Sequence, residues 1–115
     1  MNQSDFSRIC DVMATRVVKG RVSHEETFHD ERMLSMDRVV VPEKPKDHES
    51  IQVELVKATG TITATWGENR VVMKRNKDGS GYHSFLYFSI REDAACNEHA
   101  TLDAMIEHAC AAKWN

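Results

Sequence analysis

The sequence predicts an α+β fold in which a four-stranded antiparallel meander sheet is packed on one face by an N-terminal and a C-terminal amphipathic helix. Three observations predict this fold. Residues 50–90 contain four short runs with strand-like character, separated by turn residues. Apolar residues recur at helical spacing before this block and again after it. The 115 residues match the size of one domain, so we expect a single α+β domain over residues 1–115.

The first helix is predicted over residues 5–19. Ser4 is a suitable N-cap, and Gly20 is a suitable stop at the C-terminal end. Between them, apolar side chains recur every three or four residues, as expected of one buried face. These residues are Phe6, Ile9, Cys10, Met13 and Val17.

Residues 21–41 give weaker signals. A short strand could begin at Arg21 and Val22, residues 31–36 suit a turn of helix or a loop, and residues 39–41 form a short extended run that Pro42 ends. Residues 42–50, with two prolines and many charged or imidazole side chains, predict a solvated loop.

Four extended runs then predict the strands of the sheet. Alternating apolar residues mark the first two runs, although these two could also form one bent strand. Glycine-containing turns separate the runs, and the turn over residues 77–81 is rich in residues that tolerate positive φ. The predicted strands cover residues 51–55, 61–66, 71–75 and 82–90.

The last helix is predicted over residues 100–113, after a short polar link. Thr101 or Asn97 would cap it, and Asp103 suits the dipole of the first turn. Its apolar face comprises Leu102, Met105, Ile106, Ala109 and Cys110.

Side-chain alternation sorts the strand residues into two faces. The strongly apolar set should lie under the helices; it comprises Ile51, Val53, Leu55, Ile62, Ala64, Trp66, Val71, Met73, Leu86, Phe88 and Ile90. The opposite set is mixed; it comprises Gln52, Glu54, Val56, Thr61, Thr63, Thr65, Val72, Lys74, Phe85 and Tyr87. Phe85 and Tyr87 would make an apolar patch larger than a small monomer usually leaves uncovered.

Two interpretations of this second face remain open. Residues 21–41 could fold back over it with Phe28, Met33 and Leu34. Alternatively, the face binds a partner, either a second copy of the chain or another protein. On the second interpretation, the partner-binding residues are Thr61, Thr63, Thr65, Val72, Phe85 and Tyr87.

The sequence contains no recognisable catalytic or metal-binding pattern. His24 and His29 are five residues apart, whereas two histidine ligands on one helix face are four apart. Gly79-Ser80-Gly81 has neither the spacing nor the strand-to-helix context of a nucleophile elbow, so it predicts a hairpin turn. The three cysteines show no metal-ligand spacing and are interpreted as core thiols. We expect no enzyme activity, no catalytic residue, no metal and no cofactor.

Charge and hydropathy restrict the partners. The formal net charge of −3 gives no general attraction to nucleic acid or anionic lipid, and no apolar run is long enough to span a membrane. Because the N-terminus lacks a secretory signal, we expect a cytoplasmic protein.

One basic cluster departs from the acidic net charge of the chain. It lies beside aromatic residues, a combination that can bind single-stranded nucleic acid. It comprises Arg70, Lys74, Arg75 and Lys77.

Three functional hypotheses follow. The first is a small soluble intracellular protein-interaction module, such as an inhibitor, an immunity protein, an adaptor or a chaperone-like binder, that acts through an exposed sheet face as a homodimer or with another protein. The second is a single-stranded nucleic-acid binding protein that uses the basic hairpin. The third is a small-ligand site between helix and sheet, lined by Trp66, Met73 and Phe88.

Overall fold

The structure, a computed structural model, describes most of the chain. Backbone and side chains are described for residues 1–23, 35–44, 46, 48–87, 96–112 and 114. For residues 27–28 only the backbone is described.

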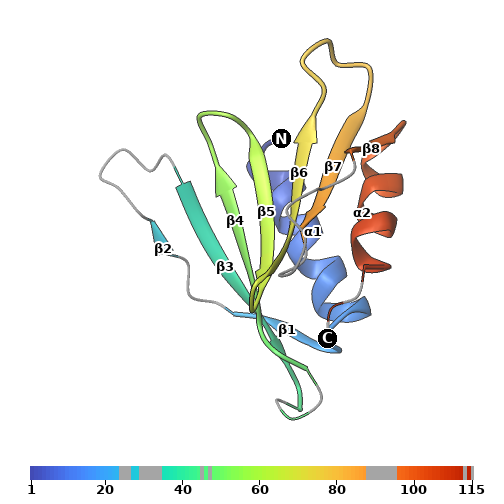
Figure 1. Cartoon of the computed structure of the whole chain (residues 1–115). Coiled ribbons are helices and arrows are strands. Elements are labelled where there is room, and N and C mark those ends of the chain that lie inside the picture. The colour runs from blue at the N-terminus through green and yellow to red at the C-terminus, as the bar shows by residue number, and fades with distance from the viewer. Residues whose placement is uncertain are drawn as a thin grey trace.

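Within these residues the fold is α+β, with two helices and one antiparallel sheet (Figure 1). Seven strands form the meander in the order β1-β3-β4-β5-β6-β7-β8, and β2 pairs with β3 beside this path, so the prediction of four strands was wrong. The strands are β1 (Gly20–Val22), β2 (Thr27–Phe28), β3 (Ser35–Pro42), β4 (Ile51–Val56), β5 (Thr61–Trp66), β6 (Asn69–Arg75), β7 (Tyr82–Tyr87) and β8 (Cys96–His99).

The four central strands confirm the block predicted from residues 50–90. β4 and β5 are separate antiparallel strands rather than one bent strand. β6 begins at Asn69, two residues before the predicted start at Val71. β7 is described up to Tyr87, so the predicted end of this strand at residues 88–90 lies outside the described residues. The turn between β6 and β7 contains Gly79 at φ 77°, as the glycine-rich sequence predicted.

The additional strands come from segments with weak sequence signals. β1 confirms the short strand predicted at Arg21 and Val22, and β3 is a longer version of the run predicted at residues 39–41. β8 was predicted as a polar link, because its sequence, Cys-Asn-Glu-His, has little strand preference. Pairing with β7 over four residue pairs makes it a strand, so the tertiary partner overrides the local preference.

Helix α1 (Gln3–Arg16) begins and ends earlier than predicted. Its N-cap is Asn2 rather than Ser4, because Asn2 Oδ1 accepts a hydrogen bond from the Asp5 amide at 2.9 Å while Asp5 accepts one from the Asn2 amide. The helix ends before the β-branched Val17, and Lys19 adopts φ 50°, which turns the chain into β1.

Helix α2 (Leu102–Cys110) lies inside the predicted range of 100–113. Its N-cap is Thr101, one of the two predicted candidates, and the Thr101 Oγ1 accepts a hydrogen bond from the Ala104 amide at 3.1 Å. Ion pairs between Arg8 and Asp103 and between Arg16 and Glu107 join it to α1 at the surface.

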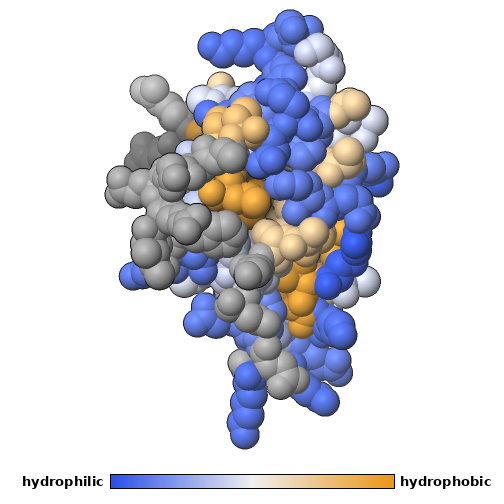
Figure 2. Space-filling view, turned by 45° about the vertical axis from the view of Figure 1, so that its right-hand side comes forward, coloured by the Kyte–Doolittle hydropathy of each residue, from blue (hydrophilic) through white to orange (hydrophobic). Residues whose placement is uncertain are grey.

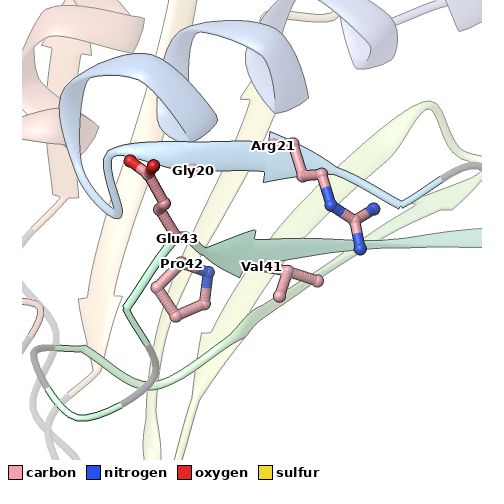
Figure 3. A pocket seen from close by; sticks show the side chains of 5 residues that line it. All are labelled: Gly20, Arg21, Val41, Pro42 and Glu43. Carbon is pink, nitrogen blue, oxygen red and sulfur yellow. The ribbon is translucent and has the colours of Figure 1, made fainter.

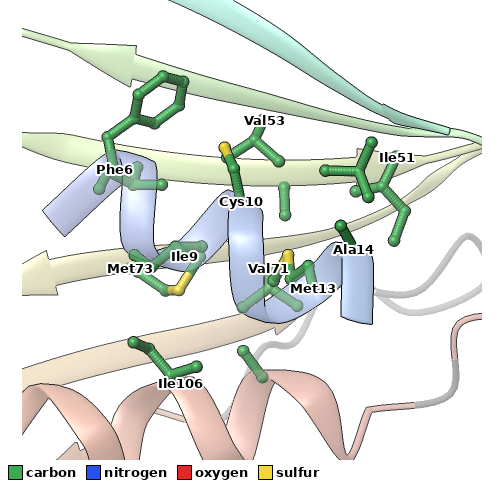
Figure 4. Close-up of a cluster of buried hydrophobic side chains, with 14 of the residues drawn as sticks. Phe6, Ile9, Cys10, Met13, Ala14, Ile51, Val53, Val71, Met73 and Ile106 are labelled. Carbon is green, nitrogen blue, oxygen red and sulfur yellow. The ribbon is translucent and has the colours of Figure 1, made fainter. Parts of the chain in front are cut away.

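Both helices lie on the same face of the sheet, which we call the covered face. Figure 4 shows α1 lying across several strands, with its apolar side chains directed toward them. The apolar set that alternation assigned to this face is buried wherever it is described, except that Leu86 is half-buried. Fully buried side chains include Phe6, Ile9 and Met13 from α1 and Ile51, Leu55, Ile62 and Met73 from the sheet.

Gly20 allows β1 to approach β3. A Cβ atom at this position would lie 1.9 Å from the Val41 carbonyl oxygen and 2.8 Å from the Glu43 amide nitrogen, both of which are backbone atoms. Only glycine fits there without a shift of the backbone. The residue predicted as a helix stop therefore serves as a packing position in the sheet.

Candidate interaction surface

The side of the sheet opposite the two described helices, which we call the free face, carries the mixed set of side chains as predicted. Cross-strand pairing arranges these side chains in rows across the sheet. One row runs through Val39, Gln52, Thr65, Arg70 and Tyr87. The next row runs through Asp37, Glu54, Thr63, Val72, Phe85 and Cys96.

An aromatic ladder occupies β7 on the free face. The rings of His83 and Phe85 meet edge to face with centroids 5.6 Å apart, and those of Phe85 and Tyr87 are tilted with centroids 6.3 Å apart. The guanidinium carbon of Arg70 lies 4.5 Å from the centroid of the Tyr87 ring. Phe85 and Tyr87 are half-buried and do not belong to the core. The structure therefore places these two rings at the surface of the sheet rather than inside the protein.

The remaining free-face side chains are small or charged. Thr61, Thr63 and Thr65 form a row of half-buried threonines along β5. On one side of this row, β4 carries the carboxylate of Glu54. On the other side, β6 carries the exposed cations Arg70 and Lys74, with the half-buried Val72 between them. The free face therefore carries a carboxylate on β4 and two cations on β6, on opposite sides of β5.

The structure divides the basic cluster predicted from the sequence. Arg70 and Lys74 lie on the free face, where Lys74 pairs with His83 across β6 and β7. Arg75 is on the opposite face by alternation and is exposed, and Lys77 lies in the turn that follows β6. Only part of the cluster is therefore beside the aromatic ladder.

The described parts of residues 21–41 form strands at the edge of the sheet. β1 pairs with residues 40–42 of β3, and β2 pairs with Met36 and Asp37. These backbone segments extend the sheet sideways. The side chains of Phe28, Met33 and Leu34, which could have covered the free face, lie outside the residues described in full.

The predicted ligand site between helix and sheet coincides with the core where it is described. Met73 is fully buried and Trp66 is 2% exposed. The ring of Trp114 packs against that of Trp66 with centroids 3.7 Å apart, and the Trp114 indole donates a hydrogen bond to the Ala109 carbonyl at 2.8 Å. Phe88 lies outside the described residues.

A polar contact between β7, β8 and α2 was not predicted. Ser84 is fully buried on the covered face, and its hydroxyl lies 2.9 Å from Nε2 of His99. The rings of His99 and His108 have centroids 5.0 Å apart. Burial lowers the pKa of His99, the charge of His108 adds to this effect, and Glu98 opposes it. The nine-residue spacing of the two histidines gave no signal, because the pairing of β8 brings them together.

The cysteines occupy three different environments. Cys10 is buried as predicted, Cys110 is half-buried, and Cys96 is exposed, so the prediction of a core thiol was wrong for Cys96. Desolvation raises the pKa of the Cys96 thiol, and the neighbouring Glu98 carboxylate adds to the effect, which disfavours a reactive thiolate.

Among the described residues, no three histidine, cysteine or acidic side chains gather closely enough to hold a metal ion. His24 and His29, whose five-residue spacing argues against a shared metal on a helix, lie outside those residues.

A hollow of about 410 Å³ lies where β1 meets the end of β3. It is lined by Gly20, Arg21, Val41, Pro42 and Glu43. Figure 3 shows the side chains of Arg21 and Glu43 at opposite ends of this group, directed away from each other. They do not converge on a common point, so the hollow lacks the paired polar anchors of a typical ligand site.

Apolar and hydrophilic side chains are both present on the surface of the described residues. In Figure 2, apolar side chains form a broken band down the middle of the view, with hydrophilic side chains to its right. Neither α1 nor α2 is long and apolar enough to cross a membrane. No protein-family model, curated protein or solved structure matches this chain at a significant level.

Proposed function

We propose that this protein is a small protein-interaction module that binds another polypeptide through its free face. The observation that carries the proposal is the aromatic ladder on β7. Phe85 and Tyr87 lie side by side on a sheet surface that no described helix covers. Burying such rings against a partner removes a large apolar area from water.

The composition of the free face supports a protein partner. Tyrosine, phenylalanine and arginine are enriched at protein interfaces, and tyrosine and arginine often carry most of the binding energy. Arg70 already packs on the ring of Tyr87, which holds both side chains in place before binding. The half-buried Thr63 and Val72 lie beside Phe85 in the same cross-strand row, so a partner could pack against all three side chains.

The charge distribution favours protein over single-stranded nucleic acid. A nucleic-acid groove usually has one sign of charge along the path of the backbone. Here Glu54 lies in the same row as Val72 and Phe85, and Glu98 pairs with His83 at the end of the ladder. In addition, the Arg70 guanidinium occupies a position over the Tyr87 ring, where a base would stack.

The test is affinity capture from a lysate of the native host with the purified chain as bait, with and without nuclease. We expect the intact chain to retain a polypeptide after nuclease treatment. The double variant Phe85→Ala/Tyr87→Ala should lose it, because both rings of the free face are removed. Loss of all captured material after nuclease would instead support the nucleic-acid alternative.

Tyr82→Ala is the matched control for this experiment. It also removes one ring from β7, but Tyr82 is on the covered face and packs against the core. The control should retain the captured polypeptide, and circular dichroism should show that all variants are folded. Equal capture by the intact chain and the double variant would contradict the proposed function.

A further inference from the structure

We propose, building on the proposed function, that the polypeptide bound to the free face is a second copy of this chain. A symmetric dimer requires a surface that complements itself after a two-fold rotation. The free face meets this requirement, because Glu54 on β4 and the cations Arg70 and Lys74 on β6 lie on opposite sides of β5.

The arrangement of strands fixes the position of the two-fold axis. If the axis runs along β5 between two facing sheets, β4 of each copy lies over β6 of the other. Glu54 then lies over Val72 of the partner copy, between Arg70 and Lys74, which are the free-face residues on either side of Val72 along β6. The same contact occurs twice, and each carboxylate reaches a cation of the opposite copy.

The residues on the axis suit this packing. Each threonine of β5 would meet a threonine of the other copy, and these compact β-branched side chains allow two sheets to approach to about 10 Å. Farther from the axis, β7 of one copy lies over β3 of the other. Tyr87 and Val39 are in one cross-strand row and Phe85 and Asp37 in the next, at equal distances from β5, so the rotation places Tyr87 against Val39 and Phe85 against Asp37.

The size of the surface predicts a dimer that dissociates on dilution. From β3 to β7 the free face is about 20 Å wide, and six residues of strand give it a length of about 20 Å. Stable interfaces bury about 800 Å² of accessible surface on each partner. A flat face of these dimensions covers only about 400 Å², roughly half of that value, so the measured mass should depend on protein concentration.

Charge reversal tests the inference, with mass measured by sedimentation equilibrium over a range of concentrations. The intact chain should approach twice its mass of 13.1 kDa. Glu54→Lys should reduce the mass to that of one chain, and so should Arg70→Glu/Lys74→Glu, because like charges then face each other across the axis. An equimolar mixture of the two variants should restore the doubled mass, which also shows that both variants are folded.

Asp11→Lys is the matched control, because it makes the same charge change on an exposed residue of α1, on the other side of the sheet. It should retain the doubled mass. The inference would be overturned if the intact chain has the mass of one chain at every concentration. It would also be overturned if neither charge-reversal variant lowers the measured mass of the dimer. If that single chain still captures a polypeptide in a manner sensitive to Phe85 and Tyr87, the proposed function stands while the second copy is excluded.

Discussion

The two faces of the sheet are built from the same strands and differ because neighbouring residues point in opposite directions. On β6, Val71 and Met73 are fully buried under the helices, whereas Val72 between them is only half-buried. On β7, the fully buried Ser84 is next to the half-buried Phe85. The covered face supplies the fully buried core of the sheet, whereas the apolar side chains of the free face stay half-buried. Buried and half-buried side chains therefore alternate along one and the same strand.

The largest difference between the faces should appear in thiol labelling. Cys96 pairs with Phe85, lies on the free face and is exposed, whereas Cys10 is fully buried beneath the sheet. A thiol reagent should modify Cys96 in the folded protein, but it should reach Cys10 only when the structure opens. If this requires global unfolding, the rate ratio should be at least about 10³. Mass spectrometry of labelled peptides measures both rates.

Comparable labelling rates for Cys10 and Cys96 would remove the distinction between a covered and a free face. The half-buried Cys110 provides an internal reference, because we expect its rate to lie between the other two. Labelling of all three in denaturant shows that the reagent itself does not discriminate among them.

A pair of neighbouring substitutions on β6 tests the energetic side of the comparison. Met73→Ala should lower the free energy of unfolding by about 2 to 5 kcal/mol, because it leaves a cavity under α1. Val72→Ala should lower it by about 1 kcal/mol or less, because the side chain is half-buried on the free face. Urea denaturation measures both values. Similar losses for the two variants would mean that both faces contribute equally to the core.

A smaller effect is expected from pH. Burial lowers the pKa of His99 below its ordinary value of 6.5, so the unfolded chain binds this proton more readily than the folded chain. The contribution to stability is complete above pH 6.5 and is lost as the pH falls through the lowered pKa. The groups around His99 are Ser84 and Tyr82 on β7, His108 on α2 and the adjacent Glu98.

The measurement compares urea denaturation at about pH 7.5 and about pH 5 for the intact chain and His99→Gln. The intact chain should lose more stability at the lower pH than the variant does, because the variant has no imidazole to titrate at this position. The same loss in both proteins would show that other groups cause the pH dependence.

Local patterns predicted the central part of the fold. Ile62, Ala64 and Trp66 alternate with threonines, and this period of two residues assigned each side chain to its observed face. Apolar spacing likewise identified both helices, and the Thr101 cap was recognisable from its side chain. The helix ends were less predictable. The first helix is capped by Asn2 instead of the predicted Ser4, and its other end depends on Lys19 adopting a positive φ.

Parts of the candidate surface required the tertiary structure. The sequence identified the threonines, Phe85 and Tyr87, but not the contact of Arg70 with Tyr87, because the two residues are neighbours only through the pairing of β6 and β7. It also gave no indication that Cys96 lies beside Phe85. The predicted meander already places β5 between Glu54 and Lys74, but Arg70 joins this face only because β6 begins at Asn69, before its predicted start.

The sequence by itself determined the class of the fold, the two helices and the division of the central strands into an apolar and a mixed face. These features follow from side-chain periodicity, which acts between residues close together in the chain. The tertiary structure alone decided the seven-strand order, the edge strand β8 and the contact between His99 and His108. Those features depend on hydrogen bonds and packing between distant segments, which can turn a polar segment without strand preference into a strand.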